Sequence, residues 1–279
     1  MPELPEVENT VNSLSDLVVA RKIIDFWTDV PQRVSNLEKI SFFKKEILRL
    51  RRVGKNIIFD LSGGVSILVH QKISGHVLYG VWSQNGDAWT TKDKFLSERI
   101  NSFVRFVFVL DNKHMVTVVD PRKFAKVEVW KTKDLSQKLA ESIAPDALSV
   151  SKNDFVDILS KRKGIIKRVL MDQSIISGIG NIYSDEILWW AKTNPYVVAK
   201  DADAVAVYNA TRKVLLKAIE LKGDSMSDYR RVDGTKGSFQ KEHKVYGREG
   251  QKCFREDGGI IQIRKMGNRS LRFCPVCQK

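Results

Sequence analysis

The sequence predicts an α+β protein of several domains, with an N-terminal β-sandwich, a helical middle and a short C-terminal segment that carries the cysteines. Between residues 23 and 130, short β-rich runs are separated by Gly, Asn or Asp turns without intervening helices, which favours a β-sandwich. From residue 140 to 221 the apolar residues recur at helical spacing instead. A chain of 279 residues is long enough for two or three domains. We expect these at residues 1–133, 134–241 and 242–279.

Each predicted element rests on the spacing of its apolar residues. Val7, Val11, Leu14, Leu17 and Val18 predict a helix near the N-terminus that buries one face. Strands are predicted at residues 57–61, 65–69, 103–110, 115–119 and 125–130. Helices are predicted at residues 152–160, 164–171, 181–192 and 202–221. Three polar stretches predict a loop at residues 82–98, a connector at 131–138 and a mobile loop at 223–237.

The charge balance favours a polyanionic partner. Lys and Arg number 47 against 33 Asp and Glu, which gives a net charge of +14. Nucleic acid is the first candidate and an anionic membrane surface the second. We find no apolar run of membrane length and no signal-peptide pattern, so we expect a cytoplasmic protein that does not use a membrane. The three cysteines all lie at or after residue 253, and this clustering indicates a metal site or no function rather than a disulfide framework.

The first residues offer an amine for covalent catalysis. Removal of Met1 would leave Pro2 as a secondary amine beside the carboxylate of Glu3. A free α-amino group has a pKa of roughly 7.7–8.0, so part of it is uncharged near neutral pH. Its attack on an electrophilic carbon would give a cationic iminium that accepts electrons, while Glu3 moves protons. Taken alone, the stretch could equally be a helix start with Pro5 in the first turn.

Residues 1–8, Met-Pro-Glu-Leu-Pro-Glu-Val-Glu, closely resemble the start of the formamidopyrimidine-DNA glycosylases, which excise oxidised purines from DNA. Residues 120–125, Asp-Pro-Arg-Lys-Phe-Ala, resemble the family's Asp-Pro-Arg-Arg-Phe-Gly, and residues 171–183 resemble its helix-two-turn-helix. Such matches run in family order to residue 278. The resemblance implies a zinc-finger-like C-terminal β-hairpin and a monomer that binds damaged or abasic double-stranded DNA in a basic cleft.

The resemblance also implies a combined glycosylase and abasic-site lyase. Pro2 would attack C1′ of the flipped nucleotide while Glu3 moves protons, and the iminium would drive β- and δ-elimination. Lys55 and Arg269 would assist, and Glu6 would position the nucleoside. Arg269 lies in Gly-Asn-Arg-Ser, similar to the family's Gly-Gly-Arg-Ser. The loop at residues 223–237 resembles the family's lesion-capping loop.

Several residues are expected to contact DNA. Ile73 takes the place of the family's wedge methionine in His-Leu-Gly-Met-Ser/Thr-Gly, and Lys72 replaces a glycine. In the family, the arginine that corresponds to Arg122 contacts the base left without its partner, and the phenylalanine that corresponds to Phe124 is inserted into the base stack. Glycines at 178 and 180 before Asn181 predict a phosphate site at a helix start. A dinucleotide fold is disfavoured because Tyr183 occupies the third glycine position. The expected contacts are His70, Ile73, Arg122, Phe124, Lys163, Lys167 and Asn181.

The cysteines correspond to an incomplete zinc site. The family holds zinc with two Cys-x-x-Cys pairs, but here Cys274 and Cys277 form one pair and Cys253 stands alone. Zinc accepts carboxylate oxygen, so Asp257 or Glu256 could supply the fourth ligand. His243 is a further candidate, and a hairpin without zinc is the alternative. We expect one structural zinc ion and no organic cofactor.

Three other functions remain open. The related endonuclease VIII branch prefers oxidised pyrimidines, but its usual start has glycine where this chain has Leu4. Tautomerases also use an N-terminal proline, yet they are far shorter and lack a phosphate-binding helix pair. A non-catalytic relative that binds damaged DNA would keep Asn181 and Arg269 but would have no use for the pair of Pro2 and Glu3.

Overall fold

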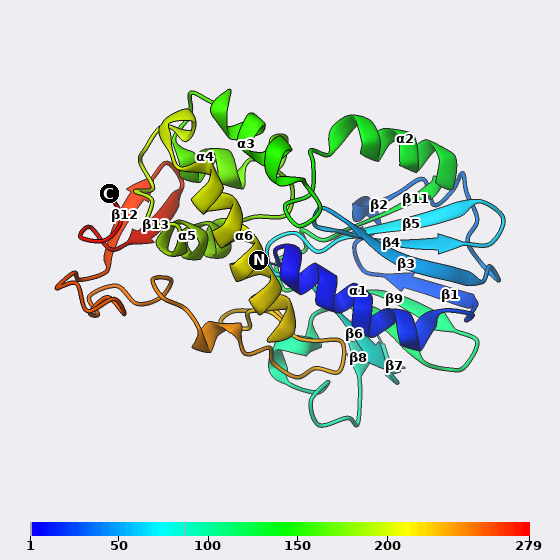
Figure 1. The fold of residues 1–279 in the computed structure, drawn as a ribbon. Coiled ribbons are helices and arrows are strands. Elements are labelled where there is room, and N and C mark those ends of the chain that lie inside the picture. Colours follow the sequence, from blue (N-terminus) through cyan, green and yellow to red (C-terminus); the bar gives the residue numbers. More distant parts are fainter. Residues whose placement is uncertain (1, 87) are drawn as a thin grey trace. The chain divides into compact units, whose positions relative to one another are not determined.

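A computed structural model describes residues 2–86 and 88–279, and the chain forms two compact units (Figure 1). The first unit joins Met1–Glu141 to Leu221–Ser238. The second joins Ser142–Glu220 to Phe239–Lys279. The cysteine-bearing tail therefore shares a unit with the helices, and the loop after the last long helix belongs to the β-rich unit.

The first unit contains the predicted β-sandwich. Its sheets have the strand orders β1-β9-β10-β6 and β2-β11-β5-β4-β3, and every pairing is antiparallel except that of β2 with β11. A separate short hairpin is formed by β7 and β8. The strands are β1 (Ile23–Thr28), β2 (Val34–Ser35), β3 (Ile47–Val53), β4 (Asn56–Leu61), β5 (Val65–His70), β6 (His76–Gly80), β7 (Ser83–Asn85), β8 (Ala88–Thr90), β9 (Val104–Leu110), β10 (Met115–Val119) and β11 (Lys126–Lys131).

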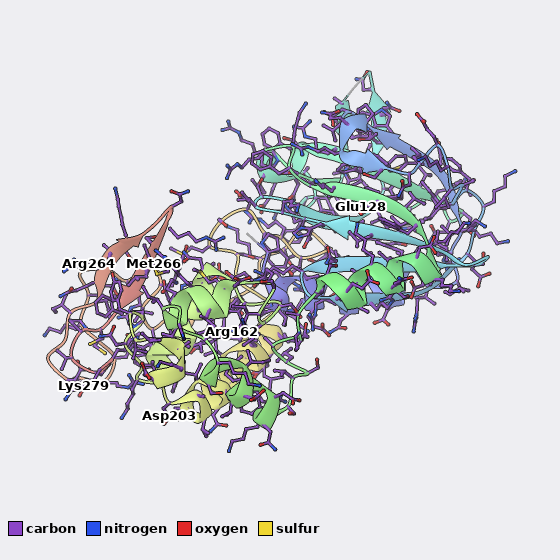
Figure 2. The ribbon with its side chains drawn as sticks, turned by 90° about the horizontal axis from the view of Figure 1, so that it is seen from above. Glu128, Arg162, Asp203, Arg264, Met266 and Lys279 are labelled. Carbon is purple, nitrogen blue, oxygen red and sulfur yellow. The ribbon has the colours of Figure 1, made fainter. Side chains whose placement is uncertain are left out.

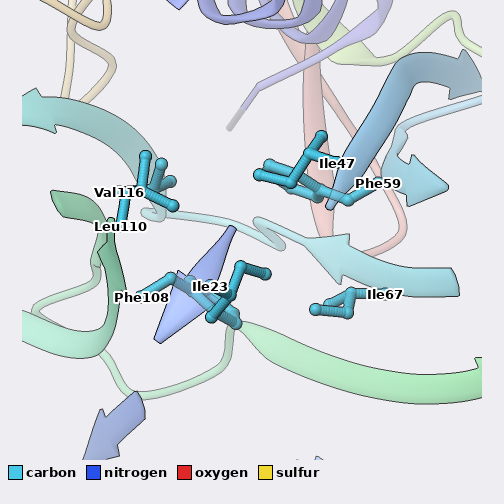
Figure 3. Close-up of a pocket in the computed structure, with 7 residues that line it drawn as sticks. All are labelled: Ile23, Ile47, Phe59, Ile67, Phe108, Leu110 and Val116. Carbon is cyan, nitrogen blue, oxygen red and sulfur yellow. The ribbon is translucent and has the colours of Figure 1, made fainter. Parts of the chain in front are cut away.

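Apolar side chains from both sheets meet in one core. Alternate residues of β5, such as Ile67 and Val69, point into this core, as the period of two in a strand requires. Figure 3 shows a small gap lined only by apolar side chains from six strands. They are Ile23, Ile47, Phe59, Ile67, Phe108, Leu110 and Val116.

Two helices complete the first unit. Helix α1 (Leu4–Val18) packs against β3 and β4, so the N-terminal helix is confirmed. Four residues of its predicted apolar face are buried, but Leu17 is exposed. Helix α2 (Thr132–Ser142) occupies the stretch expected to be a connector, so that prediction is wrong. Its buried face consists of Leu135 and Leu139, one helical turn apart. The expected loop at residues 82–98 contains β7 and β8.

The second unit is helical and ends in a β-hairpin. Its central helix α5 packs against α4, α6 and β13. The elements are α3 (Lys152–Ser160), α4 (Ile166–Met171), α5 (Asn181–Trp190), α6 (Ala204–Glu220), β12 (Gln262–Met266) and β13 (Arg269–Phe273). The four predicted helices are thus confirmed, and Figure 2 labels Arg264 and Met266 on the hairpin. Within the described residues, no helix has both the length and the apolar character needed to span a bilayer.

Candidate functional site

Reciprocal hydrogen bonds hold the N-terminal residues at the start of α1. The carboxylate of Glu3 accepts the backbone N–H of Glu6, and the carboxylate of Glu6 accepts that of Glu3 at 2.9 Å. Both side chains are buried. This capping box fixes the backbone directly after Pro2, which a catalytic amine requires. Met1, on whose removal that chemistry depends, lies outside the described residues.

The segment at residues 223–237, expected to be a mobile loop, packs against α1. Glu6 Oε1 accepts the backbone N–H of Asp224 at 2.8 Å, and the hydroxyl of the buried Tyr229 donates to the Glu6 carbonyl at 3.4 Å. A Cβ on Gly223, whose φ is +84°, would lie 2.9 Å from Glu6 Oε1. The backbone N–H of Tyr79 on β6 donates to the Val232 carbonyl at 2.8 Å. The segment is therefore hydrogen-bonded to two elements of the first unit.

Lys55 lies in the two-residue turn between β3 and β4. Gly54 precedes it with φ +57°, the left-handed conformation that such hairpin turns need. Arg52 forms an ion pair with Glu8 of α1 and donates to the Gly54 carbonyl at 2.9 Å. Arg52 thereby links the turn of Lys55 to the helix of Glu3, a role for which the sequence offers no signal.

His70 ends β5 and is held by the loop that follows it. Its Nδ1 accepts the backbone N–H of Lys72 at 2.9 Å, so the neutral ring carries its proton on Nε2. Burial, followed by the positive charges of Lys72, Lys55 and Lys126, lowers the pKa of His70 to about 3. Lys72, two residues after His70, has φ +57°. Glycine adopts this left-handed conformation without strain, which explains why it suits this position in the related motif. Ile73 is 41% exposed, as a wedge requires.

The buried carboxylate of Asp120 joins the two loops that carry the expected wedge residues. It accepts a hydrogen bond from the hydroxyl of Ser74, next to Ile73. It also accepts the backbone N–H groups of Phe124 at 2.6 Å and Arg122 at 3.1 Å. Arg122 is exposed, and its guanidinium carbon lies 4.9 Å from the centre of the Phe124 ring. The Asp-Pro turn at residues 120 and 121 is the sequence signal for this role of Asp120, because an aspartate at a turn commonly accepts hydrogen bonds from nearby backbone N–H groups.

Asn181 occupies the first turn of α5 in the second unit. Its Oδ1 is buried and has no hydrogen-bond partner within the described part of the chain. The preceding turn places Gly178 at φ +106° and is held by Gln173, whose Oε1 accepts the Gly178 N–H at 2.9 Å. Glycine is needed there because side chains rarely adopt this conformation.

Lys167 does not face solvent, so its expected contact with DNA is corrected. Its side chain is fully buried, and Nζ lies 2.6 Å from Asp185 Oδ1 and 2.9 Å from Ser184 Oγ. The basic run suggested an exposed face, but this position points into the unit between α4 and α5. Lys163, in the same run, is exposed.

Arg269 opens β13 as an exposed side chain. Its Nη1 lies 3.6 Å from the sulfur of Met171, and no carboxylate among residues 2–86 and 88–279 forms an ion pair with it. The strand is anchored nearby, because Asp185 Oδ2 accepts the backbone N–H of Arg272 at 3.1 Å. Lys167 also donates to the Asn181 carbonyl at 3.2 Å, so one buried ion pair supports the elements of both Asn181 and Arg269.

Four side chains of the tail could hold a metal ion. Ligand atoms of Cys253, Asp257, Cys274 and Cys277 all lie within 4.8 Å of one another. The sulfurs of Cys253 and Cys277 are 3.9 Å apart, and Cys274 Sγ lies 3.6 Å from Asp257 Oδ2. A tetrahedral zinc site with Zn–S near 2.3 Å and Zn–O near 2.0 Å would need about 3.8 Å and about 3.5 Å. The four residues therefore fit, and Glu256 is not among them.

Further residues shape this cluster. A Cβ on Gly259 would lie 2.3 Å from Cys274 Sγ, so glycine is needed for the close approach. Trp189 Nε1 donates to Cys253 Sγ at 3.4 Å, and Arg255 donates to Cys277 Sγ at 3.0 Å. His243 is outside the cluster, and its Nδ1 lies 3.0 Å from the Tyr246 carbonyl.

Comparisons with known proteins cover the whole chain. The model of the formamidopyrimidine-DNA glycosylase N-terminal domain matches residues 1–127, and that of the formamidopyrimidine-DNA glycosylase H2TH domain matches residues 143–230. The chain is 32% identical to the formamidopyrimidine-DNA glycosylase of Desulfitobacterium hafniense and 35% identical to that of Ruegeria pomeroyi, each over 100% of both chains.

Solved structures agree with this match. The Lactococcus lactis Fpg in complex with DNA containing an abasic site has a TM-score of 0.85 at 30% identity, over 99% of both chains. The MutM (Fpg) protein of Thermus thermophilus has a TM-score of 0.83 at 32% identity, over 99% of this chain and 98% of that one.

Proposed function

The chain belongs to the formamidopyrimidine-DNA glycosylase family, and we propose that it removes oxidised purines from duplex DNA and then cuts the abasic strand. It is a DNA glycosylase of base-excision repair that acts on damaged DNA. Relatives of known structure bind DNA that contains an abasic site or Fapy-dG. The observation that carries the proposal is the capping box of Glu3 and Glu6, which holds Pro2 at a fixed helix start.

The proposed reaction begins at the amine of Pro2 once Met1 is removed. The amine attacks C1′ of the flipped nucleotide, the bond from C1′ to the base breaks, and Glu3 moves the protons that this exchange requires. The C1′–O4′ bond then breaks as O4′ takes up a proton, which opens the sugar ring and leaves the iminium. The iminium accepts electrons as C2′ and then C4′ lose a proton, and the phosphates on the 3′ and 5′ sides leave in turn. Lys55 and Arg269 stabilise the negative charge that develops on these phosphates. Both are basic groups on hairpins that the surrounding hydrogen bonds hold in place.

The two loops joined by Asp120 extrude the nucleotide from the duplex. Unstacking a base costs a few kcal/mol, so side chains must replace the missing stacking and pairing. Ile73 and Phe124 supply apolar surface and Arg122 supplies hydrogen-bond donors, and the shared carboxylate keeps the loops together. Glu6, whose carboxylate is hydrogen-bonded to the segment at residues 223–237, positions the nucleoside.

The cysteine cluster would hold one zinc ion with Asp257 as the fourth ligand. When bound, zinc supplies a structural cross-link and takes no part in the chemistry. The ligands come from residues 253–257 and 274–277, and the second group directly follows β13, the strand of Arg269. The N–H donors of Trp189 and Arg255 moderate the negative charge of three thiolates and one carboxylate.

Borohydride trapping on a duplex containing 8-oxoguanine tests the proposal. Protein whose intact mass shows that Met1 is absent should form a covalent DNA adduct, and Pro2→Gly should form less because its amine is primary. Pro5→Ala, a matched change in the same helix, should still form the adduct. A duplex with an oxidised pyrimidine should be a poorer substrate. Absence of any adduct from processed wild-type protein would overturn the proposal.

A further inference from the structure

The segment at residues 223–237, which we call the capping segment, forms a compact loop in the first unit. Its two ends meet, because a Cβ on Gly237 would lie 2.2 Å from the carbonyl oxygen of Gly223. Val232 reaches into the core of the β-sandwich, whereas the tip at residues 226–227 is exposed. A compact loop of this kind depends for its shape on its own side chains and on the surface against which it packs.

Arg230 joins the tip of the capping segment to the neighbouring stretch at residues 93–98. The side chain of Arg230 is buried, and its Nη1 donates to the Ser227 carbonyl at 3.1 Å and to the Tyr229 carbonyl at 3.0 Å. Its Nε lies 3.2 Å from Oε2 of Glu98. One guanidinium therefore holds the backbone near the tip and also binds a carboxylate outside the capping segment, as its planar fork of donors allows.

Gly234 brings a second part of the capping segment against residues 93–98. Its φ is +81°, and an added Cβ would lie 2.7 Å from the carbonyl carbon of Phe95 and 2.8 Å from the carbonyl oxygen. The same carbonyl accepts a hydrogen bond from Asn101 Nδ2 at 2.9 Å. Asn101 Oδ1 lies 2.8 Å from Nε2 of the buried His76 on β6. Hydrogen bonds therefore connect the surface that receives Gly234 to the sheet.

Residues 93–98 have hydrogen bonds of their own. Asp93 Oδ1 accepts the backbone N–H groups of Phe95 at 2.9 Å and of Leu96 at 3.0 Å. The Asp93 carbonyl accepts the N–H of Ser97 at 2.9 Å. Leu96 is buried in an apolar cluster on the sheet of β6. This stretch can therefore serve as a fixed support for the capping segment, a role that the proposed reaction has not yet assigned to any residue.

We propose that Glu98 and Arg230 are positioning residues that hold the capping segment in place to cover the extruded base. The inference rests on the proposed function, in which Glu6 positions the nucleoside. Glu6 binds the first part of the capping segment through the N–H of Asp224, and Glu98 binds the part near the tip through Arg230. A loop that is already ordered loses less conformational freedom when the substrate binds. Loss of the pair should therefore slow removal of a base, but an abasic site has no base to cover and should be cut at the same rate.

Two substrates test this role. We would measure single-turnover rates at saturating protein on an 8-oxoguanine duplex and on a duplex with a preformed abasic site. Glu98→Gln removes a partly exposed ion pair, so base excision should slow about two- to fivefold while abasic cleavage keeps its rate. Arg230→Gln also loses two hydrogen bonds to backbone carbonyls, so its excision should slow on the order of tenfold or more. Equal slowing on both substrates, or unchanged excision, would overturn the proposal.

Matched variants separate the pair from a general effect of charge. Asp157→Asn removes the same charge from an exposed ion pair with Lys161 at α3 and should change neither rate. The double variant with Glu98→Gln and Arg230→Gln should be no slower than Arg230→Gln alone, because the two residues act through each other. Rate losses that multiply in the double variant would contradict a shared role.

Glycine variants test the contact at Phe95. Gly234→Ala adds a Cβ that must push Phe95 away, so it should slow base excision and leave abasic cleavage unchanged. Gly250→Ala is the matched control, because Gly250 has the same φ of +81° but its added Cβ would have no neighbour within 4 Å in the described parts of the chain. It should change neither rate. Equal excision rates in the two variants would contradict a role for this close contact.

Hydrogen exchange without DNA distinguishes failure of the pair from failure of the proposed function. The N–H of Tyr79 donates to the Val232 carbonyl at 2.8 Å, so its exchange reports whether the capping segment is docked. It should exchange about two- to fivefold faster in Glu98→Gln than in wild type. Unchanged exchange, with equal excision by wild type and variant, would refute only the role of the pair. Faster exchange in the variant, with no action of processed wild type on either substrate, would refute only the proposed function.

Discussion

The hydroxyl of Ser74 donates a hydrogen bond to the buried carboxylate of Asp120, although the two residues are 46 positions apart. The same carboxylate accepts the N–H groups of Phe124 and Ala125. One side chain therefore sets the loop of Ile73 and the loop of Arg122 relative to each other. In the mechanism that we propose, base extrusion depends on that relationship.

Removing the Asp120 carboxylate should impair both folding and base extrusion. Asp120→Ala leaves several buried donors unpaired, so we expect a loss of about 1–3 kcal/mol in the free energy of unfolding. Ser74→Ala removes one hydrogen bond and should cost about 1 kcal/mol. Chemical denaturation measures both losses. In a duplex with 2-aminopurine beside the lesion, the fluorescence rise on binding should be smaller for Asp120→Ala. A full rise in Asp120→Ala at saturating protein would contradict the role of Asp120.

Metal content should depend on Asp257 and not on its neighbour. Asp257→Ala removes a ligand, so purified protein should hold less than one zinc per chain or release it faster to a chelator. Glu256→Ala is the matched control and should keep one zinc. Elemental analysis and a chelator assay measure this. Equal zinc content and release in the two variants would exclude Asp257 as a ligand.

Gly259→Ala should damage the same cluster by crowding. The added Cβ would lie 2.3 Å from Cys274 Sγ and 2.8 Å from Asp257 Oδ1, so these two ligands must separate. We expect loss of zinc comparable to that of Asp257→Ala, measured by elemental analysis. Ile260→Ala changes the next residue, which is exposed, and should retain zinc. Retention by Gly259→Ala would show that the ligands do not approach this closely.

Lys167 should matter for stability rather than for DNA contact. Lys167→Ala leaves the buried Asp185 carboxylate without its cation, which typically costs about 3–5 kcal/mol. Replacing both partners, as in Lys167→Met with Asp185→Leu, should recover much of that loss. Lys163→Ala should leave the unfolding free energy unchanged and weaken DNA binding. A stable Lys167→Ala variant whose DNA affinity depends less on salt would restore the expectation that Lys167 contacts DNA.

The depressed pKa of His70 predicts a measurable pH dependence of stability. As the pH falls from 7.5 to 5.5, the unfolded chain gains a proton at His70, with a pKa near 6.5, whereas the folded chain stays neutral down to a pKa of about 3. Stability should therefore fall with pH in this window, by about 1.4 kcal/mol from His70 alone. His70→Asn should show a shallower fall in denaturation experiments, and His76 contributes equally to both proteins. Identical pH profiles would contradict the depressed pKa.

Elements with a clear apolar period could be predicted from the sequence, whereas those held by long-range contacts could not. The period predicted the bounds of α3 and β10. It missed β3 because charged residues occupy one face of this strand, where Arg49 and Arg51 pair with Asp60 on β4. An alternation of leucine with arginine gives no sign of that cross-strand partner.

In the candidate site, too, motifs could be read from the sequence but long-range contacts could not. Motifs predict Glu3, Glu6 and Asn181 as site residues, but they do not predict the contact of Glu6 with Asp224, which joins residues 218 positions apart. A glycine-bearing polar stretch predicts a mobile loop when such a partner is unknown. Likewise, the basic run before α4 gave no sign that Lys167 turns inward to Asp185.

The central claim is that the amine of Pro2 performs the reaction, and peptide mapping of the trapped adduct tests it most directly. Processed protein would be trapped with borohydride on an 8-oxoguanine duplex, digested with nuclease and protease, and sequenced by tandem mass spectrometry. We expect the sugar remnant to be attached to the nitrogen of Pro2, in a peptide that begins Pro-Glu-Leu. A remnant on a lysine such as Lys55, with Pro2 unmodified, would contradict the claim.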